Sequence, residues 1–151
     1  MPPNSLPYAA PAPLAWRLLA ATYDLLPLLG LWFTAAALGV GITGGALDVH
    51  RLGDKVLVQT IAIAFTAVYF VVSWVRGGQT IGMKAWRLRV VRSDGRPLGM
   101  ARALLRFAIA TLSFAAIGLG FAWALVDERR RTWHDLAADT VLVRMEKRAE
   151  G

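Results

Sequence analysis

Leu14–Val40 reads LAWRLLAATYDLLPLLGLWFTAAALGV, an apolar stretch that carries two opposite charges. As a helix it is long enough to cross the ~30 Å hydrocarbon core of a bilayer. Arg17 lies near its start, and Asp24 lies about two turns further in. A charge in hydrocarbon costs at least roughly 2.5–3.5 kcal/mol, so each residue needs a partner. The stretch therefore predicts a membrane-spanning helix whose charged pair serves either activity or stability.

Two further apolar blocks support membrane residence. Val56–Val75 carries no charge and matches the hydrocarbon thickness, so it predicts a second spanning helix. Phe107–Val126 is also uncharged but contains Gly118 and Gly120. The mean hydropathy is +0.48 and 56% of the residues are hydrophobic, against roughly 45–50% in soluble domains. We expect an all-α membrane protein that lies in the lipid bilayer.

The positive charge is concentrated between the second and third apolar blocks. The chain has a net charge of +7, and only Asp94 opposes the basic residues of this segment. These residues are Arg76, Lys84, Arg87, Arg89, Arg92, Arg96, Arg102 and Arg106. In a soluble protein such a patch would indicate nucleic acid, but between apolar segments it indicates a cytoplasmic loop. We expect no nucleic acid partner, and contact with anionic lipid or another protein at the residues Lys84, Arg87, Arg89, Arg92 and Arg96.

The balanced loop on the other side fixes the predicted orientation. In residues 39–55 the charges of two aspartates, an arginine and a lysine cancel, so this loop should face the cell exterior. The amino terminus should be cytoplasmic, and we expect the protein to lie in an inner (plasma) membrane. Because Asp24 and Pro27 interrupt the first apolar block, we expect it to be retained as an anchor and not removed as a signal peptide.

The third apolar block allows two topologies. A single crossing would place Arg129, Arg130 and Arg131 outside, against the positive-inside rule. A bend at Gly118–Gly120 would make a hairpin of helices over about 100–117 and 119–130 and return the chain to the cytoplasm. Such short limbs do not span a bilayer, so they must be tilted, re-entrant or packed against the first two helices. We favour the hairpin over the single span.

Two segments have the pattern of short strands. Trp86, Leu88 and Val90 alternate with basic residues, and Thr140–Arg144 is also strand-like. An isolated strand would leave its backbone unpaired, so we expect the two to pair on the cytoplasmic side. The segment GGQTIGMK, residues 77–84, lacks the Gly-Lys-Ser/Thr ending of a phosphate loop, which excludes that mode of nucleotide binding.

The predicted organisation is one membrane domain between two tails. Residues 1–13 are proline-rich and should be irregular, residues 14–143 should form the membrane domain, and residues 144–151 should be a tail. Within the domain we expect helices over about 14–40, 56–75, 100–117 and 119–130.

Three charged residues and two longer segments resemble a known family. Arg17, Asp24 and Asp135, together with GGQTIGMKAWRLRVV and RRRTWHDLAADTVLV, are similar to the RDD family of bacterial membrane proteins, named for one arginine and two aspartates. The resemblance extends from Leu14 to about Val143. It implies a membrane protein for which transport of unidentified ligands has been suggested and no reaction agreed. Ile81 stands where the family often has proline, and Asp139 where glycine is common.

The charged residues need partners from other elements. Arg17 and Asp24 share a helix face but lie about 10 Å apart along the axis. We expect Asp135 to meet Arg17 near the cytoplasmic face. Asp24 should be met by water or by polar groups of the second helix, such as Gln59, Thr60 or Thr66.

Two roles are open for this charge network. In one, Asp24 is a membrane-embedded ion or proton site, Arg17 adjusts its charge state, and His134 with Asp135 guards the cytoplasmic entrance. In the other, the charges lock helix to helix and tail to membrane domain.

Transport of a small ion or solute, such as cation–proton exchange, is the leading function predicted from the sequence. Because so few helices can enclose little space for a transport path, we expect a homo-oligomer or a membrane-protein partner. The alternative is a non-transporting accessory protein that binds a partner or anionic lipid through the basic loop. No nucleophile, metal cluster or cofactor motif is evident, and cysteine is absent, so we expect neither enzyme activity, nor a metal, nor a cofactor.

Overall fold

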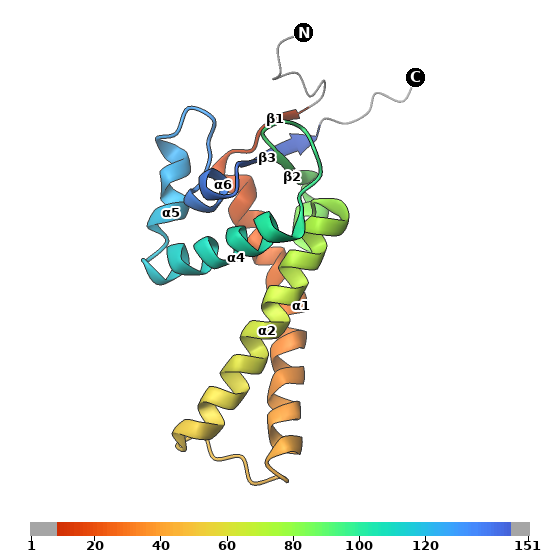
Figure 1. Cartoon of the computed structure of the whole chain (residues 1–151), viewed down its shortest axis with the longest axis vertical. Coiled ribbons are helices and arrows are strands. Elements are labelled where there is room, and N and C mark those ends of the chain that lie inside the picture. The colour runs from red at the N-terminus through yellow and green to blue at the C-terminus, as the bar shows by residue number, and fades with distance from the viewer. Residues whose placement is uncertain (1–8, 146–151) are drawn as a thin grey trace.

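Two long helices form the stem of the molecule. The computed structural model describes residues 9–145, and in it α1 (Leu14–Ile42) and α2 (Leu52–Gly77) lie side by side, joined by a loop at one end (Figure 1). Both are long and apolar enough to cross a membrane. Pro27 lies inside α1 without ending it. Large apolar side chains such as Leu26 and Phe33 are exposed on the stem, as lipid-facing residues are. The predicted pair of long apolar helices is confirmed.

The third apolar block is broken, as the hairpin interpretation requires. Helix α4 (Met100–Ala115) is followed by α5 (Leu119–Ala122) and a 3-10 turn, η1 (Trp123–Leu125), and the two limbs are bent by 108°. Gly118 makes the corner with a φ of 74°, a left-handed conformation that glycine adopts without steric cost. In Figure 1, α4 runs across the stem instead of along it.

The second limb is shorter than predicted, ending at Leu125 instead of near residue 130. Asp127 explains the early end. One oxygen of its carboxylate accepts hydrogen bonds from the backbone N–H groups of Arg129, at 3.0 Å, and Arg131, at 2.9 Å. An aspartate that bonds to the backbone just ahead of it favours a turn over a continuing helix.

A three-stranded antiparallel sheet covers one end of the stem. Strand β3 (Thr140–Met145) lies between β1 (Ala9–Pro11) and β2 (Leu88–Arg92). The predicted pairing of β2 with β3 is confirmed, with Val90 opposite Leu142.

The expectation of an irregular segment over residues 1–13 is wrong for residues 9–11, which form β1. This strand pairs with the edge of β3 that β2 leaves open, with Ala10 opposite Arg144. An open strand edge has unpaired backbone groups, which explains why the segment is recruited. The expectations for residues 1–8 and 146–151 lie outside the described residues.

Two short helices complete the end that carries the sheet, called the sheet end below. They are α3 (Ile81–Ala85), which follows α2, and α6 (Trp133–Ala137), which precedes β3. Each begins after a threonine cap: the Thr80 hydroxyl accepts from the backbone of Met83, and Thr132 forms a capping box with Asp135. The buried apolar core lies under the sheet and includes the residues Val71, Trp74, Leu88, Val90, Ala103 and Leu142.

Candidate functional site

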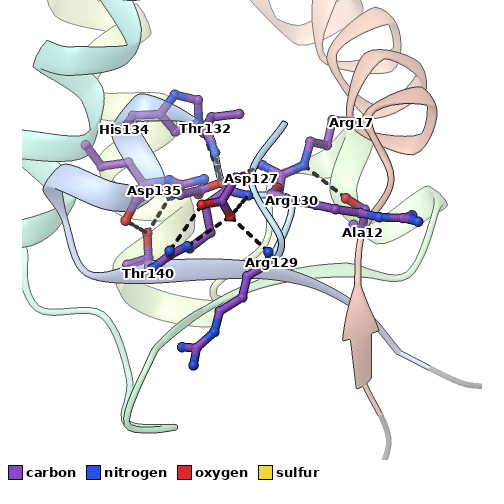
Figure 2. Close-up of polar contacts among 11 residues, drawn as sticks. Ala12, Arg17, Asp127, Arg129, Arg130, Thr132, His134, Asp135 and Thr140 are labelled. Carbon is purple, nitrogen blue, oxygen red and sulfur yellow. Dashed lines mark hydrogen bonds and ion pairs between the residues drawn. The ribbon is translucent and has the colours of Figure 1, made fainter. Parts of the chain in front are cut away.

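Arg17 binds Asp135 across the sheet end, as predicted. Its Nη1 donates to Oδ2 of Asp135 at 2.6 Å. The other guanidinium nitrogens are also used, because Nε donates to the carbonyl of Ala12 at 3.2 Å and Nη2 to that of Arg130 at 2.6 Å. Figure 2 shows the Arg17 side chain reaching from α1 toward these groups. The pair joins the start of α1 to α6 and to the loop before it.

A second arginine, Arg106 of α4, shares the same carboxylate. Its Nη1 donates to Oδ1 of Asp135 and, at 2.7 Å, to the hydroxyl of Thr140. The guanidinium also lies over the ring of Trp74, 5.0 Å from its centroid, a cation–π arrangement. The sequence analysis placed Arg106 among loop charges, but the structure buries it. Its position beside the apolar block starting at Phe107 was the signal that could have identified it.

Asp135 is fully buried and its charge is held by donors from three elements. Besides the two arginines, its Oδ2 accepts from the backbone N–H of Thr132, at 3.1 Å, and from the Thr132 hydroxyl, at 2.9 Å. Burial alone raises the pKa of Asp135, but the charges of Arg106 and Arg17 outweigh it and hold the pKa well below its usual range. The carboxylate is therefore ionised, and two positive charges face this single negative one.

His134 is buried beside this cluster. Its Nε2 lies 2.8 Å from the hydroxyl of Thr132, and its ring packs on Phe121 at a centroid distance of 5.0 Å. Burial, followed by the positive charge of Arg106, lowers the pKa of His134 to about 3, although Asp135 opposes the shift. The imidazole is therefore neutral at neutral pH.

Asp24 forms a second buried centre, two turns along α1. Asp24 is only 3% exposed. Oδ1 accepts from the Tyr69 hydroxyl at 2.6 Å and from the backbone N–H of Gly82 at 2.8 Å, while Oδ2 accepts from the Thr80 hydroxyl at 2.6 Å. One carboxylate thus joins α1, α2 and the start of α3.

The second helix does supply a partner of Asp24, Tyr69, but the three residues named from the sequence are wrong. Gln59 and Thr60 are exposed, and the Thr60 hydroxyl donates to its own helix at Val56. Thr66 donates to Ala62 of its own helix and accepts from the indole of Trp32 at 3.0 Å.

The register of the two stem helices explains this error. Gly39 packs closely on Val58, and Trp32 reaches Thr66, so counting back along both helices brings Asp24 level with the last turns of α2. At 1.5 Å per residue, Gln59 lies roughly 20 Å from that level. Tyr69 and the residues after the helix are close enough, which is why they supply the donors.

The two centres differ in charge balance. Within the described part of the chain, Asp24 has no lysine, arginine or histidine nitrogen within salt-bridge distance, and its partners are all neutral. Asp135 has two arginines. A carboxyl group without a charged partner and a net positive centre therefore lie on the same face of α1, about 10 Å apart along its axis. Residues 9–145 contain no group of three or more His, Cys, Asp or Glu that could hold a metal.

The predicted contact residues of the basic loop lie at the sheet end. Lys84, Arg87 and Arg89 are exposed. Arg92 binds Asp94 at 2.7 Å, and the Nε of Arg96 lies 3.8 Å from the same carboxylate. The structure thus brings these residues to the end that carries the charge network, but on its outer surface.

Comparison with known proteins gave one match. The model of the RDD family matches residues 11–139. No curated protein and no solved structure showed a match to the chain.

Proposed function

The chain belongs to the RDD family, and we propose that it moves a small cation or a proton across the membrane by binding it at Asp24. The observation that carries this proposal is the neutral environment of a buried carboxylate inside the first apolar helix. An ionised group there, without a counter-charge, is expensive to maintain. A bound proton or cation supplies the missing positive charge.

The partners of Asp24 suit a group that changes its charge. Hydroxyl groups both donate and accept hydrogen bonds, so those of Tyr69 and Thr80 can stay bonded to the carboxyl group after it takes up a proton. Both hydroxyls are also fixed by backbone donors, Ile81 N–H at 3.2 Å for Tyr69 and Met83 N–H at 3.1 Å for Thr80. The site can therefore bind and release without rearranging the surrounding helices.

Charge asymmetry supports an orientation with the sheet end in the cytoplasm. The exposed basic residues Lys84, Arg87, Arg89, Arg129 and Arg130 all belong to that end. In the loop at the other end, Asp54 and Asp48 balance Arg51 and Lys55. We therefore propose a multi-pass protein of a bacterial inner membrane, with the sheet end in the cytoplasm and Asp24 nearer that side.

The proposal includes assembly into an oligomer. Two spanning helices leave most of their surface toward lipid, and Leu25, Leu29 and Phe33 are exposed on α1. A path for an ion needs walls on all sides, because polar groups are not tolerated against lipid. Further copies, or another membrane protein, would complete the wall around Asp24.

Ion flux in vesicles tests the proposal. Purified wild type and Asp24→Asn are reconstituted, and proton and sodium fluxes are measured with the same amount of folded protein. We expect flux in the wild type and its loss, by about a hundredfold or more, in the variant. Asp94→Asn is the matched control, because it removes an exposed carboxylate at the sheet end. Equal flux in wild type and Asp24→Asn would refute a transport role for Asp24.

The exposed basic surface favours a second candidate, a membrane accessory that binds an acidic partner or anionic lipid. Its test is the combined replacement of Arg87, Arg89 and Arg96 by glutamine. The accessory function predicts that this variant loses binding to anionic vesicles while Asp24→Asn keeps it. The transport function predicts that flux depends on Asp24 and tolerates the three arginine changes.

A further inference from the structure

Helix α4 has a charged face and an uncharged face. Arg102 and Arg106 point to the sheet end, where Arg102 donates to the carbonyl of Ala138 at 3.1 Å and Arg106 binds Asp135. The opposite face is exposed and repeats every three or four residues. It consists of Ala101, Leu104, Ala108, Thr111, Leu112 and Ala115. The hydroxyl of Thr111, its one polar group, donates to the carbonyl of Phe107 in the same helix.

The contacts of α4 with α2 define its depth. Phe107 packs on Phe70 at a centroid distance of 6.3 Å, and Arg106 lies over Trp74. The uncharged run of α2 ends at Val75 and is followed by Arg76. Phe70 lies about 9 Å before Arg76 along the helix axis. With α2 spanning the bilayer, α4 lies near the boundary between acyl chains and headgroups.

The direction of α4 differs from that of the two spanning helices (Figure 1). The helix runs across the stem, and α5 turns back toward the sheet end (Figure 1). The 108° bend between the limbs places this turn at Gly118. The block therefore stays within one side of the bilayer.

The corner between α4 and α5 carries the most exposed large apolar side chains among the described residues. Ile117 is 96% exposed and Phe114 78% exposed. Ile117 also has a φ of 58°, which is strained for a β-branched residue and costs roughly 1–3 kcal/mol. In water, a strained and fully exposed isoleucine beside an exposed phenylalanine would be unfavourable on both counts. If hydrocarbon surrounds the corner, the cost of exposing these apolar side chains to water is removed.

We propose that α4 and its corner lie in the membrane plane, embedded among the acyl chains of the leaflet next to the sheet end. The occupant of the exposed face is lipid, because this face continues the lipid-facing surface of the stem. Its opposite, arginine-bearing face packs on α6 at the sheet end, where Arg106 binds Asp135 and Arg102 bonds to Ala138. The third apolar block thus enters one leaflet and returns without crossing.

Depth-dependent quenching in vesicles tests this placement on the full chain. Because cysteine is absent, Leu112→Cys and Ile117→Cys can each be labelled with one fluorophore. Quenchers are phospholipids with a nitroxide near the headgroup, phospholipids with a nitroxide at the chain end, and iodide in water. Phe33→Cys, midway along the uncharged part of α1 (residues 25–42), is the control for the bilayer centre, and the exposed Arg129→Cys is the control for water.

We expect both labels to be quenched about twofold or more by the nitroxide near the headgroup relative to the other two quenchers. Strongest quenching from the chain end would overturn the proposal in favour of a deeper, spanning segment. Strongest quenching by iodide would place α4 in water, and protection from all three would show that protein covers the face. Leu112→Cys alters an outward-facing side chain, so it provides the answer even if the strained corner tolerates no substitution at Ile117.

Discussion

The backbone N–H of Gly82 lies 2.8 Å from the Asp24 carboxylate, and a side chain at Gly82 would not fit there. A Cβ atom at this glycine would be 2.9 Å from Cγ of Asp24 and would overlap the carbonyl oxygen of Ala20. Helix α3 approaches α1 this closely because residue 82 has no side chain.

Gly82→Ala should therefore destabilise the protein by about 3–5 kcal/mol, since it adds a steric overlap and weakens a hydrogen bond to a buried carboxyl group. Thermal unfolding of the purified protein in detergent measures this. Gly30→Ala is the matched control, because that glycine is also inside a helix, α1, but has nothing within 4 Å of its added Cβ. The control should be unchanged or stabilised by up to about 1 kcal/mol. Similar melting of the two variants would contradict the close-approach argument.

Arg106→Gln should cost about 3–5 kcal/mol of stability, because it removes one partner of a buried carboxylate. Arg102→Gln provides the comparison, one turn away on the same helix. Its pair with Asp139, at 3.1 Å, is partly exposed, and such pairs contribute less than about 1 kcal/mol. Unfolding in detergent should separate the two variants clearly. An equal, small effect of both would mean that Arg106 is not needed to hold Asp135.

Acid should destabilise the protein through His134. The pKa of His134 is lowered to about 3 in the folded chain, so below pH 6.5 the unfolded chain takes up a proton that the folded chain does not. Between pH 7.5 and pH 5 this removes about 2 kcal/mol of stability. The loss should be absent in His134→Gln and present in His50→Gln, which changes an exposed loop residue. A pH-independent wild type over this range would show that His134 is solvated.

Thiol labelling of intact bacteria should place the two ends of the stem on opposite sides. A membrane-impermeant maleimide should label His50→Cys in the loop between α1 and α2 from outside. Arg96→Cys, exposed at the sheet end, should react only after the membrane is opened. The reverse pattern would invert the proposed orientation.

The elements that a single segment specifies could be predicted from the sequence. Long apolar stretches predicted the two stem helices, and alternation predicted β2 and β3. Gly118 indicated the bend because few other residues tolerate its backbone conformation. The contact between Arg17 and Asp135 was expected from the family resemblance. Strand β1 was missed because three residues ending in proline carry no strand pattern of their own and pair only when β3 is present.

The neighbours of Asp24 could not be predicted because they depend on register. Gln59, Thr60 and Thr66 were the candidates named from the second helix. A carboxylate, however, accepts hydrogen bonds only from groups that lie at its own depth. The donors are Tyr69, the cap of α3 and a glycine N–H, and the last leaves no side-chain signature at all. Arg106 was missed for a related reason. In the sequence, a basic residue within a basic loop cannot be distinguished from its exposed neighbours. Its burial is evident only from the packing of the folded chain.

The central strand of the sheet follows both of its neighbours in the chain. Strand β3 and Asp135 therefore leave the ribosome after α1, α2 and α4 have been made. Until then Arg17 and Arg106 have no carboxylate, and β1 and β2 have no strand between them. Insertion of the helices and closure of the sheet are thus separate steps of biosynthesis. A chain interrupted before residue 135 would leave Arg17 and Arg106 without the carboxylate that binds both of them.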